Sequence, residues 1–558
     1  MKTTRSDHAT EVLIVGGGTG GVAAALAVAE AGRSCILVEP TPWIGGQLTS
    51  QAVPPDEHKW IEGKDGFHGA TRRYVTFRNR VRDWYREHRD LTPAARSDPY
   101  LNPGGGWVSR LCFEPTIGVT VLNDWLASHV ASGRVRIVHG ARPVSADVEG
   151  EAVRGVAFDD GSDSCEIRAK FVLDATEFGD LYPLVGCDFM LGAEGRDVFD
   201  EPHGRGDLGR ETDPTDQQAI THCFALEHRP GEDHTIDRPD GYAEWRDFVP
   251  KLTPPWPGLL FSWEIDDASD PRTLAMIPPP DAPKADEWEL WRYRRIVDAS
   301  IYRSGSRSDI CLWNTVQTDF FRQPAIQPGA DAYAGRAKVL RAAKEQARCF
   351  VYWLQTEAPR HDDGHGYAGL KLRGDELGTR DGFAMAAYVR EPRRLVAQTI
   401  LTENHVGFDA RLAAGRFREE DSPAGVGQSF DDSVGIGHYP IDLHPTAAGR
   451  NSVYVRATPF QIPLGSLLPR LGGRGSGNLI AAGKAIGVSH VANGSTRLHP
   501  VEWGVGEAAG TLAAHCLDEK LAPRDVREST TRLRDFQRRL ARDGVELAWP
   551  WDPAPLAG

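Results

Sequence analysis

The chain of 558 residues has no long uncharged apolar run and no excess of positive charge. No stretch is long and apolar enough to cross a bilayer, and residues 1–10 lack the apolar core of a leader peptide. A formal net charge of −14 disfavours nucleic acid and anionic membranes as main partners, because like charges repel. We therefore expect a cytoplasmic protein that acts on a small-molecule substrate. Assembly of several chains stays open.

The eight cysteines include no C-x-x-C or similarly close pair. Scattered thiols are typical of a reducing compartment, and they argue against a redox centre made of two neighbouring cysteines. A pair assembled from distant parts of the chain stays open. Cysteine gives no support for a metal site, and the histidines and aspartates of residues 361–365 lack a third defined ligand. We therefore predict no bound metal.

The strongest positive signal lies in residues 12–39, which predict a strand, a glycine-rich turn, a helix and a second strand. Gly16, Gly18 and Gly21 occupy the glycine positions of the G-x-G-x-x-G pattern. Glycine is needed there because a Cβ atom would block the tight turn and the close approach of a diphosphate. A glycine-rich turn in an unrelated α/β protein is the competing interpretation. The order of strand, helix and second strand favours a dinucleotide site.

The same unit predicts how a dinucleotide would be held. The Ala-rich segment 22–31 should form a helix whose amino end attracts the diphosphate to the amides of Thr19 and Gly20. Glu39 ends the second predicted strand, over residues 35–38, where a carboxylate accepts hydrogen bonds from a ribose diol and repels a 2′-phosphate. The expected ligand is therefore FAD or NAD in preference to NADP.

Hydrophobic periodicity predicts further helices over residues 119–130, 333–354 and 502–517, and strands over 135–139, 155–158, 166–173 and 478–482. These elements predict an α/β fold: a Rossmann-like nucleotide-binding domain with a parallel central sheet, interleaved with an α+β substrate domain. This nucleotide-binding domain is expected in three segments, 1–50, 111–189 and 451–523. The substrate or cap domain is expected over 51–110 and 190–450, with a charged, solvated helix and tail over 524–558.

Three later segments extend the dinucleotide signal: W-I-G-G-Q-L-T-S at 43–50, F-V-L-D-A-T-E-F-G-D at 171–180 and N-L-I-A-A-G-K at 478–484. Together with residues 12–39 they resemble the FAD-dependent oxidoreductases related to glutathione-reductase-type flavoproteins. The motifs R-E-P-R-R at 390–394 and D-S-V-G-I-G-H-Y-P-I-D at 432–442 strengthen the resemblance. It spans roughly residues 10–520 and implies FAD as the cofactor without defining a reaction. The nucleotide-binding domain would then be a Rossmann-like FAD-binding domain of the three-layer ββα type.

Carried over by position, the resemblance implies roles along the cofactor. The phosphate loop and Glu39 would hold the diphosphate and ribose, Val144 would bond adenine through its backbone, and the start of a helix near Pro500 would meet the far end of the flavin. The implied cofactor-binding residues are Gly16, Gly18, Thr19, Gly20, Gly21, Glu39, Gly46, Gln47, Val144, Ala175, Thr176, Gly483, His499 and Val501. Two positions depart from the relatives: Glu177 replaces a glycine, and Lys484 replaces an acid.

Flavin chemistry suggests which side chains to consider for catalysis. Reduced flavin concentrates negative charge at N1 and the C2 carbonyl, which a helix amino end would stabilise, and oxidation of a C–H bond often needs a base. Histidine suits that task near neutral pH. The candidate catalytic residues are His58, His438, Tyr439, His490 and Arg497. The competing interpretation is structural: any of the 18 histidines can be a packing residue, and Arg497 and His499 can satisfy loop carbonyls.

No second dinucleotide pattern is visible, so electrons most simply enter from an organic substrate. We therefore predict an FAD-dependent dehydrogenase or oxidase that takes a hydride from a small polar substrate bearing an amine or hydroxyl. Oxygen or an electron carrier would reoxidise the flavin. Two alternatives stay open: a monooxygenase reduced by transiently bound NAD(P)H, and a non-catalytic protein in which FAD is structural.

Overall fold

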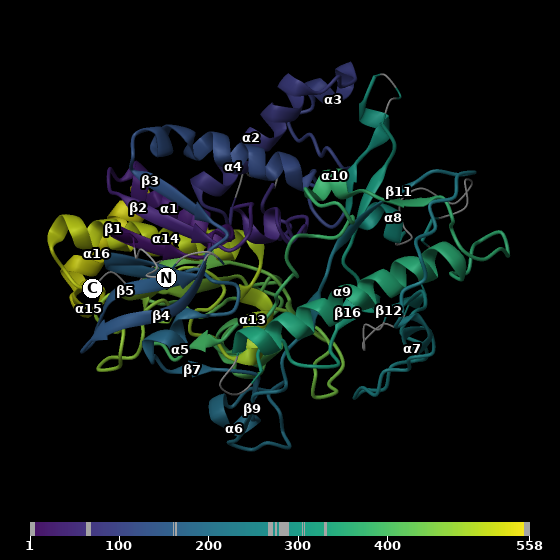
Figure 1. The fold of residues 1–558 in the computed structure, drawn as a ribbon. Coiled ribbons are helices and arrows are strands. Elements are labelled where there is room, and N and C mark those ends of the chain that lie inside the picture. Colours follow the sequence, from purple (N-terminus) through teal and green to yellow (C-terminus); the bar gives the residue numbers. More distant parts are fainter. Residues whose placement is uncertain are drawn as a thin grey trace, which may run out of the picture.

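The computed structural model describes residues 6–62, 68–159, 161, 164–265, 272–273, 276–277, 289–303, 305, 307–327 and 332–551. The ends of two expected segments, residues 1–5 and 552–558, lie outside the described residues. Figure 1 shows two parts side by side: a sheet with covering helices, and a more irregular part crossed by one long helix. Among the described residues, no helix combines the length and apolarity that a membrane span requires.

A seven-stranded sheet forms the first part, with strand order β3-β2-β1-β6-β5-β4 and β23 also paired to β6. Five strands run parallel: β1 (Ser6–Val15), β2 (Cys35–Glu39), β3 (Val135–His139), β6 (Ser164–Asp174) and β23 (Leu479–Ala481). An antiparallel arm is formed by β4 (Arg142–Glu149) and β5 (Ala152–Asp159). Because Leu479 pairs with Val172, segments from both ends of the chain share one sheet. The α/β class and parallel core predicted from the sequence are thus confirmed.

Two helices with small residues at their contact cover this sheet: α1 (Thr19–Glu30) and α14 (His499–Glu519) (Figure 1). A Cβ atom on Gly506 would lie 2.0 Å from the carbonyl oxygen of Gly20, so the two backbones touch where both residues are glycine. The helices α2 (Arg72–His88) and α4 (Pro115–Ala131) pack against each other beside them. This contact brings the amino ends of α1 and α14 to the carboxyl edge of the sheet.

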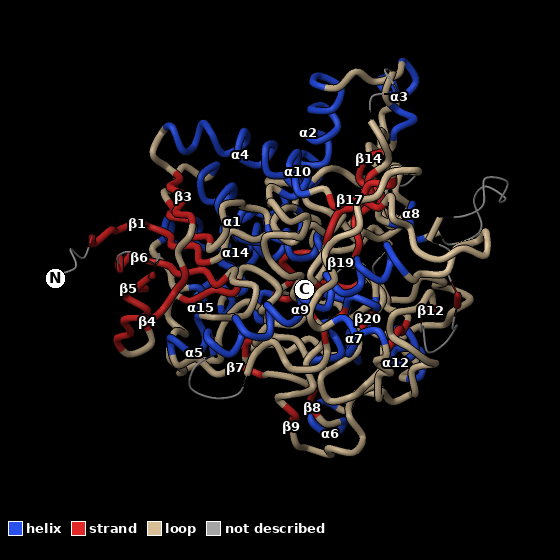
Figure 2. Tube along the Cα trace, turned by 45° about the vertical axis from the view of Figure 1, so that its right-hand side comes forward, coloured by secondary structure: helices blue, strands red, loops and turns tan. Residues whose placement is uncertain are grey.

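The second part has its own sheet and its own aromatic core. Its sheet order is β14 (Arg295–Val297), β15 (Ile310–Trp313), β11 (Phe224–His228) and β17 (Leu370–Leu372). The long helix α9 (Ala332–Thr356) packs over a buried cluster that includes Phe224, Trp313 and Phe350. Figure 2 shows how much of this part consists of loops. The expected domain boundaries remain a prediction.

Short elements complete both parts. The helices are α3 (Pro93–Ser97), α5 (Leu181–Val185), α6 (Arg196–Phe199), α7 (Tyr242–Arg246), α8 (Leu290–Tyr293), α10 (Gly374–Leu377), α11 (Glu403–Val406), α12 (Phe408–Ala413) and α13 (His490–Thr496). The strands are β7 (Phe189–Met190), β8 (Ala193–Glu194), β9 (Thr212–Asp213), β10 (Ile220–Thr221), β12 (Glu264–Ile265), β13 (Arg272–Thr273), β16 (Asp319–Phe320), β18 (Arg394–Leu395), β19 (Ser433–Gly437), β20 (Ile441–Leu443), β21 (Val453–Val455) and β22 (Phe460–Pro463).

The helices predicted over 119–130, 333–354 and 502–517 are confirmed and extend by a few residues. The single charged helix expected after residue 524 is a wrong prediction. The chain forms two helices there, α15 (Pro523–Glu528) and α16 (Thr530–Arg542), separated at Ser529. The second is amphipathic: its charged residues form the solvated face that the alternating charges predict, and its other face buries Leu533, Phe536 and Leu540.

Candidate active site

A cavity of about 490 Å³ lies at the carboxyl edge of the parallel strands, a volume typical of cofactor sites. One wall comes from the βαβ unit and the end of β6, and the opposite wall comes from α9 and the segment 385–389. The lining includes six of the predicted cofactor-binding residues: Gly16, Gly18, Glu39, Gly46, Ala175 and Thr176. It also includes Pro143, which precedes the predicted Val144.

The glycines of the phosphate loop have no room for side chains. Gly16 has φ of +100°, and its Cβ would lie 2.2 Å from the carbonyl oxygen of Ala175. A Cβ on Gly20 would lie 2.1 Å from the carbonyl oxygen of Ala482, and one on Gly21 would lie 1.9 Å from that of Gly16. The loop therefore depends on glycine for its packing, and the amino end of α1 opens toward the cavity.

Glu39 lies on the cavity wall, as its predicted ribose contact requires. Its carboxylate accepts hydrogen bonds from the backbone amides of Gly17 at 2.8 Å and Thr41 at 2.9 Å. Burial raises the pKa of Glu39 to about 7. The side chain thus shapes the turn and presents an acid whose charge depends on pH near neutrality.

At the place where the resemblance puts adenine, the cavity is lined by residues just before the predicted Val144. Ala141, Arg142 and Pro143 line the cavity, whereas Val144 is 40% exposed and is not among its lining residues. The predicted backbone contact of Val144 remains a prediction. On the facing strand end, the hydroxyl of Thr176 donates to the carboxylate of Asp174 at 2.7 Å, which fixes the turn that follows β6.

The Gly-Gly segment joins the phosphate loop to the start of α14. A Cβ on Gly46 would lie 2.8 Å from the Cα of Gly18, so the two segments touch. The amide of Gln47 is buried, donates to the carbonyl of Arg497 at 3.0 Å and also contacts Glu502. Gln47 therefore positions the helix start, and its predicted contact with the flavin remains a prediction.

Near the amino end of α14 lie buried donors that have no acceptor in the part of the chain that the structure describes. Nδ1 of His499 accepts a hydrogen bond from the backbone amide of Asp56 at 3.0 Å, and burial lowers the pKa of His499 to about 3. The neutral ring therefore carries its proton on Nε2. This atom and the Nε atoms of Arg497 and Arg294 find no hydrogen-bond partner among the described residues. Buried donors are normally satisfied, so these atoms fit a ligand with acceptor atoms, such as the carbonyl edge of a flavin.

Arg497 belongs to a polar cluster that the sequence alone did not reveal. Its guanidinium donates to the hydroxyl of Tyr388 at 2.7 Å and to the carboxylate of Asp442 at 3.1 Å. His444 contacts the same carboxylate through Nε2 at 3.5 Å, while its Nδ1 lies 2.5 Å from Oδ2 of Asp319. Burial alone would raise the pKa of Asp442, but His444 and Arg497 outweigh it and hold that pKa well below its usual range.

Two further charged groups and one predicted residue complete this cluster. Arg294 lies 3.5 Å from Asp56, and its guanidinium stacks on the ring of Tyr293. Burial raises the pKa of Tyr439 well above its usual value, and the carboxylates of Asp56 and Asp442 add to the effect. Tyr439 therefore keeps its hydroxyl proton. Of the predicted catalytic residues, the structure brings Tyr439 and Arg497 together.

His58 and His438 instead form an aromatic cluster with each other. Their ring centroids are 6.1 Å apart, and Trp549 packs 5.5 Å from His58. Each Nε2 lies 3.2 Å from a backbone carbonyl oxygen. Burial lowers the pKa of His58 to about 4 and that of His438 to about 3, so both rings are neutral at pH 7. This environment is that of packing residues, and their predicted catalytic role has no support in these contacts.

His490 lies in a separate buried ionic network. Its Nδ1 is 3.0 Å from the carboxylate of Glu391, which also contacts Arg394 at 3.5 Å. Its backbone amide donates to Glu194 at 2.8 Å. These contacts place His490 at the start of α13 as a structural residue, and its predicted catalytic role remains untested.

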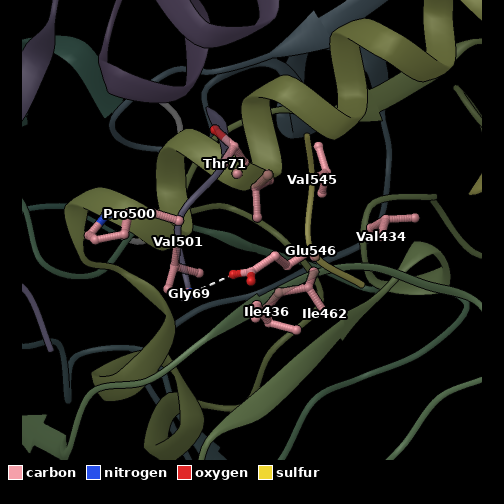
Figure 3. Close-up of a pocket in the computed structure, with 13 residues that line it drawn as sticks. Gly69, Thr71, Val434, Ile436, Ile462, Pro500, Val501, Val545 and Glu546 are labelled. Atoms are coloured by element: carbon pink, nitrogen blue, oxygen red, sulfur yellow. Dashed lines mark hydrogen bonds between the residues drawn. The ribbon is translucent and has the colours of Figure 1, made fainter. Parts of the chain in front are cut away.

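Figure 3 shows a small cavity behind the first turn of α14. Pro500 and Val501 face it together with Val434 and Ile436, and Glu546 accepts a hydrogen bond from the amide of Gly69 at 2.7 Å. Its volume of about 10 Å³ is enough for no more than one water molecule. Since the side chain of Val501 points here, the predicted contact of Val501 with the flavin would have to come from its backbone.

Part of the polar cluster carried a weak signal in the sequence. Asp442 ends the D-S-V-G-I-G-H-Y-P-I-D motif, and His444 follows it two residues later, so both were within reach of a motif search. Asp319 and Arg294 lie in stretches without recognisable pattern. Only the fold brings these two side chains to the start of α14.

The sequence profile of the family described as FAD dependent oxidoreductase matches residues 11–540. The chain therefore belongs to the FAD-dependent oxidoreductase family. It is an enzyme of that family, and its cofactor is FAD. No characterised protein sequence matches it significantly.

Similarity to solved structures is remote. L-proline dehydrogenase from P. horikoshii is 15% identical over 35% of this chain and 26% of that chain, with a TM-score of 0.18. p-Nitrophenol 4-monooxygenase from Pseudomonas putida is 14% identical over 40% and 48%, with a TM-score of 0.23. A geranylgeranyl bacteriochlorophyll reductase-like protein from Thermoplasma acidophilum is 10% identical over 97% and 85%, with a TM-score of 0.31. The chain spans less than half of the first two proteins, and none of the three informs the reaction.

Proposed function

We propose that this enzyme is a dehydrogenase or oxidase that takes a hydride from a small polar substrate bearing an amine or hydroxyl. The observation that carries the proposal is the Asp319–His444 contact of 2.5 Å beside the Arg497 cluster. FAD, when bound, supplies the acceptor for the two electrons and the hydrogen nucleus of the hydride. The residues of the chain must then bind the substrate, orient it and remove one proton.

His444 is the proposed base. Asp319 holds the Nδ1 side of the ring, so the proposed proton acceptor is Nε2, which lies 3.5 Å from the carboxylate of Asp442. In a balanced step, the substrate's C–H electron pair leaves with its hydrogen as a hydride, its O–H or N–H bond breaks, and the proton goes to Nε2 as a C=O or C=N bond forms. The side chain of His444 is 23% exposed and that of Asp442 is 24% exposed, so both remain accessible to a small substrate.

Charged and hydroxyl groups around this base suit a polar substrate. Arg497 and the hydroxyls of Tyr388 and Tyr439 offer donors, while Asp442 offers an acceptor. The unpartnered donors of Arg497 and His499 at the amino end of α14 are suited to hold a flavin carbonyl edge. This arrangement supports removal of a proton and a hydride from neighbouring atoms of one molecule.

The test is anaerobic stopped-flow bleaching of the flavin in the purified holoprotein against amines, amino acids, polyols and sugars. Saturating bleaching by one chemical class supports the proposal, and the reoxidation rate in air then separates an oxidase from a dehydrogenase that uses a carrier. NAD(P)H consumption that a substrate accelerates would instead indicate a monooxygenase. No acceleration of either half-reaction by any compound would indicate a non-catalytic flavin protein and overturn the proposal.

A further inference from the structure

Glu177 departs from the related A-T-G pattern and lies in the loop after β6, directly after Thr176. Its side chain reaches over the phosphate loop. A Cβ on Gly18 would lie 2.6 Å from Oε1 of Glu177, and a Cβ on Gly46 would lie 2.9 Å from the same atom. We call the space between Gly18, Thr19 and Gly46 the phosphate cradle. The missing side chains of two glycines leave this cradle open, and one carboxylate oxygen fills it.

The contacts of this carboxylate are uneven. Oε2 lies 2.5 Å from the ammonium group of Lys484, which is buried and donates to the carbonyl of Val389 at 2.8 Å. Both oxygens are buried and lack a well-aligned hydrogen bond among the described residues, and Oε1 lacks an ion pair as well. An unpaired, buried carboxylate oxygen is costly, yet it lies at the amino end of α1, where backbone amides favour an anion. The side chain therefore occupies an anion site without fully satisfying it.

Other acids already surround the same helix end. Glu502, in the first turn of α14, lies close to the cradle, since a Cβ on Gly18 would be 3.6 Å from its Oε1. Burial raises the pKa of Glu502 and the charge of Glu177 adds to this, against the opposing effect of Lys484. The charge of Glu177 also adds to the effect of burial on Glu39. The diphosphate of FAD would bring two more negative charges to this place, so it and the Glu177 carboxylate compete for one site.

We propose that Glu177 is a displaceable anionic occupant of the phosphate cradle, and that its carboxylate must leave before the diphosphate of FAD can enter. Glu177 thereby weakens the binding of FAD and slows its association. Lys484 holds the carboxylate in place through its ion pair with Oε2. The inference concerns cofactor loading, so it does not depend on which substrate the enzyme oxidises.

The test compares FAD binding by the full-length protein after removal of its flavin with binding by variants. Glu177→Gln removes the charge with little change of shape, and Glu177→Gly restores the residue of the related pattern. Glu149→Gln is the control, because it makes the same charge change on β4 at a side chain that is 76% exposed. Dissociation constants come from flavin fluorescence quenching, association rates from stopped flow, and ADP serves as a competing diphosphate without a flavin.

We expect Glu177→Gln and Glu177→Gly to bind FAD at least tenfold more tightly and to associate faster, with a similar gain for ADP, while Glu149→Gln matches the wild type. Glu177→Asp, whose shorter side chain withdraws from the cradle, should bind FAD with an affinity between those of the wild type and Glu177→Gln. It provides a second test if a neutral variant folds poorly. Unchanged or weaker FAD binding by folded Glu177→Gln would overturn the proposal, because it would mean that the carboxylate supports the cofactor. Since the readout is binding, a failure of the proposed oxidation would leave this result unaffected.

Discussion

Nδ1 of His444 lies 2.5 Å from Oδ2 of Asp319, a residue 125 positions earlier in the chain. Asp319 is fully buried, and its other oxygen lies 3.0 Å from Arg390. Burial alone would raise the pKa of Asp319, but Arg390 and His444 lower it, so the carboxylate stays charged at neutral pH. A charged acid on one ring nitrogen fixes the tautomer of the histidine and leaves the other nitrogen available for proton transfer.

Asp319→Asn should therefore slow reduction of the flavin by substrate about 10²- to 10⁴-fold, the range typical of losing a positioned base. The measurement is the anaerobic reduction rate over pH 6–9, roughly the range in which histidine bases act. His444→Gln should cause a similar loss, and the double variant should lose no more than the single ones, because the two residues act as a unit. FAD content and thermal unfolding check that the variants still fold although the buried ion pair of Asp319 with Arg390 is altered. Additive losses would contradict the paired role.

The contact of α1 with α14 should affect both the stability of the fold and the affinity for FAD. Gly506→Ala would place a Cβ 2.0 Å from the carbonyl oxygen of Gly20, so the helices must separate. We expect a loss of about 1–3 kcal/mol in the free energy of unfolding and weaker FAD binding, since the amino end of α1 shifts. Urea unfolding and FAD titration measure the two effects.

Gly504→Ala on the same helix is the matched control. Outside its own helix turn, its Cβ would meet only Thr71 among the described residues, at 3.9 Å. It should leave FAD binding unchanged and increase the free energy of unfolding by up to about 1 kcal/mol through helix propensity. If Gly504→Ala and Gly506→Ala changed stability and FAD binding equally, the close contact between α1 and α14 would not be the reason that residue 506 must be glycine.

The sequence was sufficient to predict the parts of the site that are formed by residues close together in the chain. Gly16, Gly21 and Glu39 were recognisable because strand, turn, helix and acid follow one another within 28 residues of the chain, residues 12–39. Asp319, His444 and Arg294 were not recognisable, because only the packing of distant segments brings their side chains together. His58 and His438 illustrate the limit further: their burial among tryptophans, which sets their pKa values, follows from tertiary structure alone.

The low pKa of His438 predicts how stability responds to acid. Burial lowers this pKa to about 3, whereas histidine in the unfolded chain titrates near 6.5. Between these pH values His438 is protonated in the unfolded chain but neutral in the folded protein. The free energy of unfolding therefore falls as pH falls below about 6.5. At 1.36 kcal/mol for each pH unit, His438 should account for a loss of about 2 kcal/mol at pH 5.

His438→Gln, which keeps a donor for the carbonyl of Ala457, should remove this part of the acid sensitivity. The measurement is urea unfolding at pH 7 and pH 5 of both proteins. His361→Gln, at an exposed position, is the control and should keep the wild-type dependence. If His438→Gln lost as much stability as the wild type on acidification, His438 would not be neutral in the folded protein.

The last tryptophans of the described chain give a test of the aromatic cluster itself. Trp549 is 2% exposed, packs against the rings of His58 and Trp60, and its indole N–H donates to the carbonyl of Phe460 at 3.2 Å. Trp551 stacks on Trp549 but is 41% exposed. Trp549→Ala should cost about 3–5 kcal/mol in the free energy of unfolding, because it leaves a cavity and an unsatisfied carbonyl, whereas Trp551→Ala should cost less than about 1 kcal/mol. Urea unfolding followed by circular dichroism measures both, and equal costs would mean that the cluster does not anchor the end of the chain.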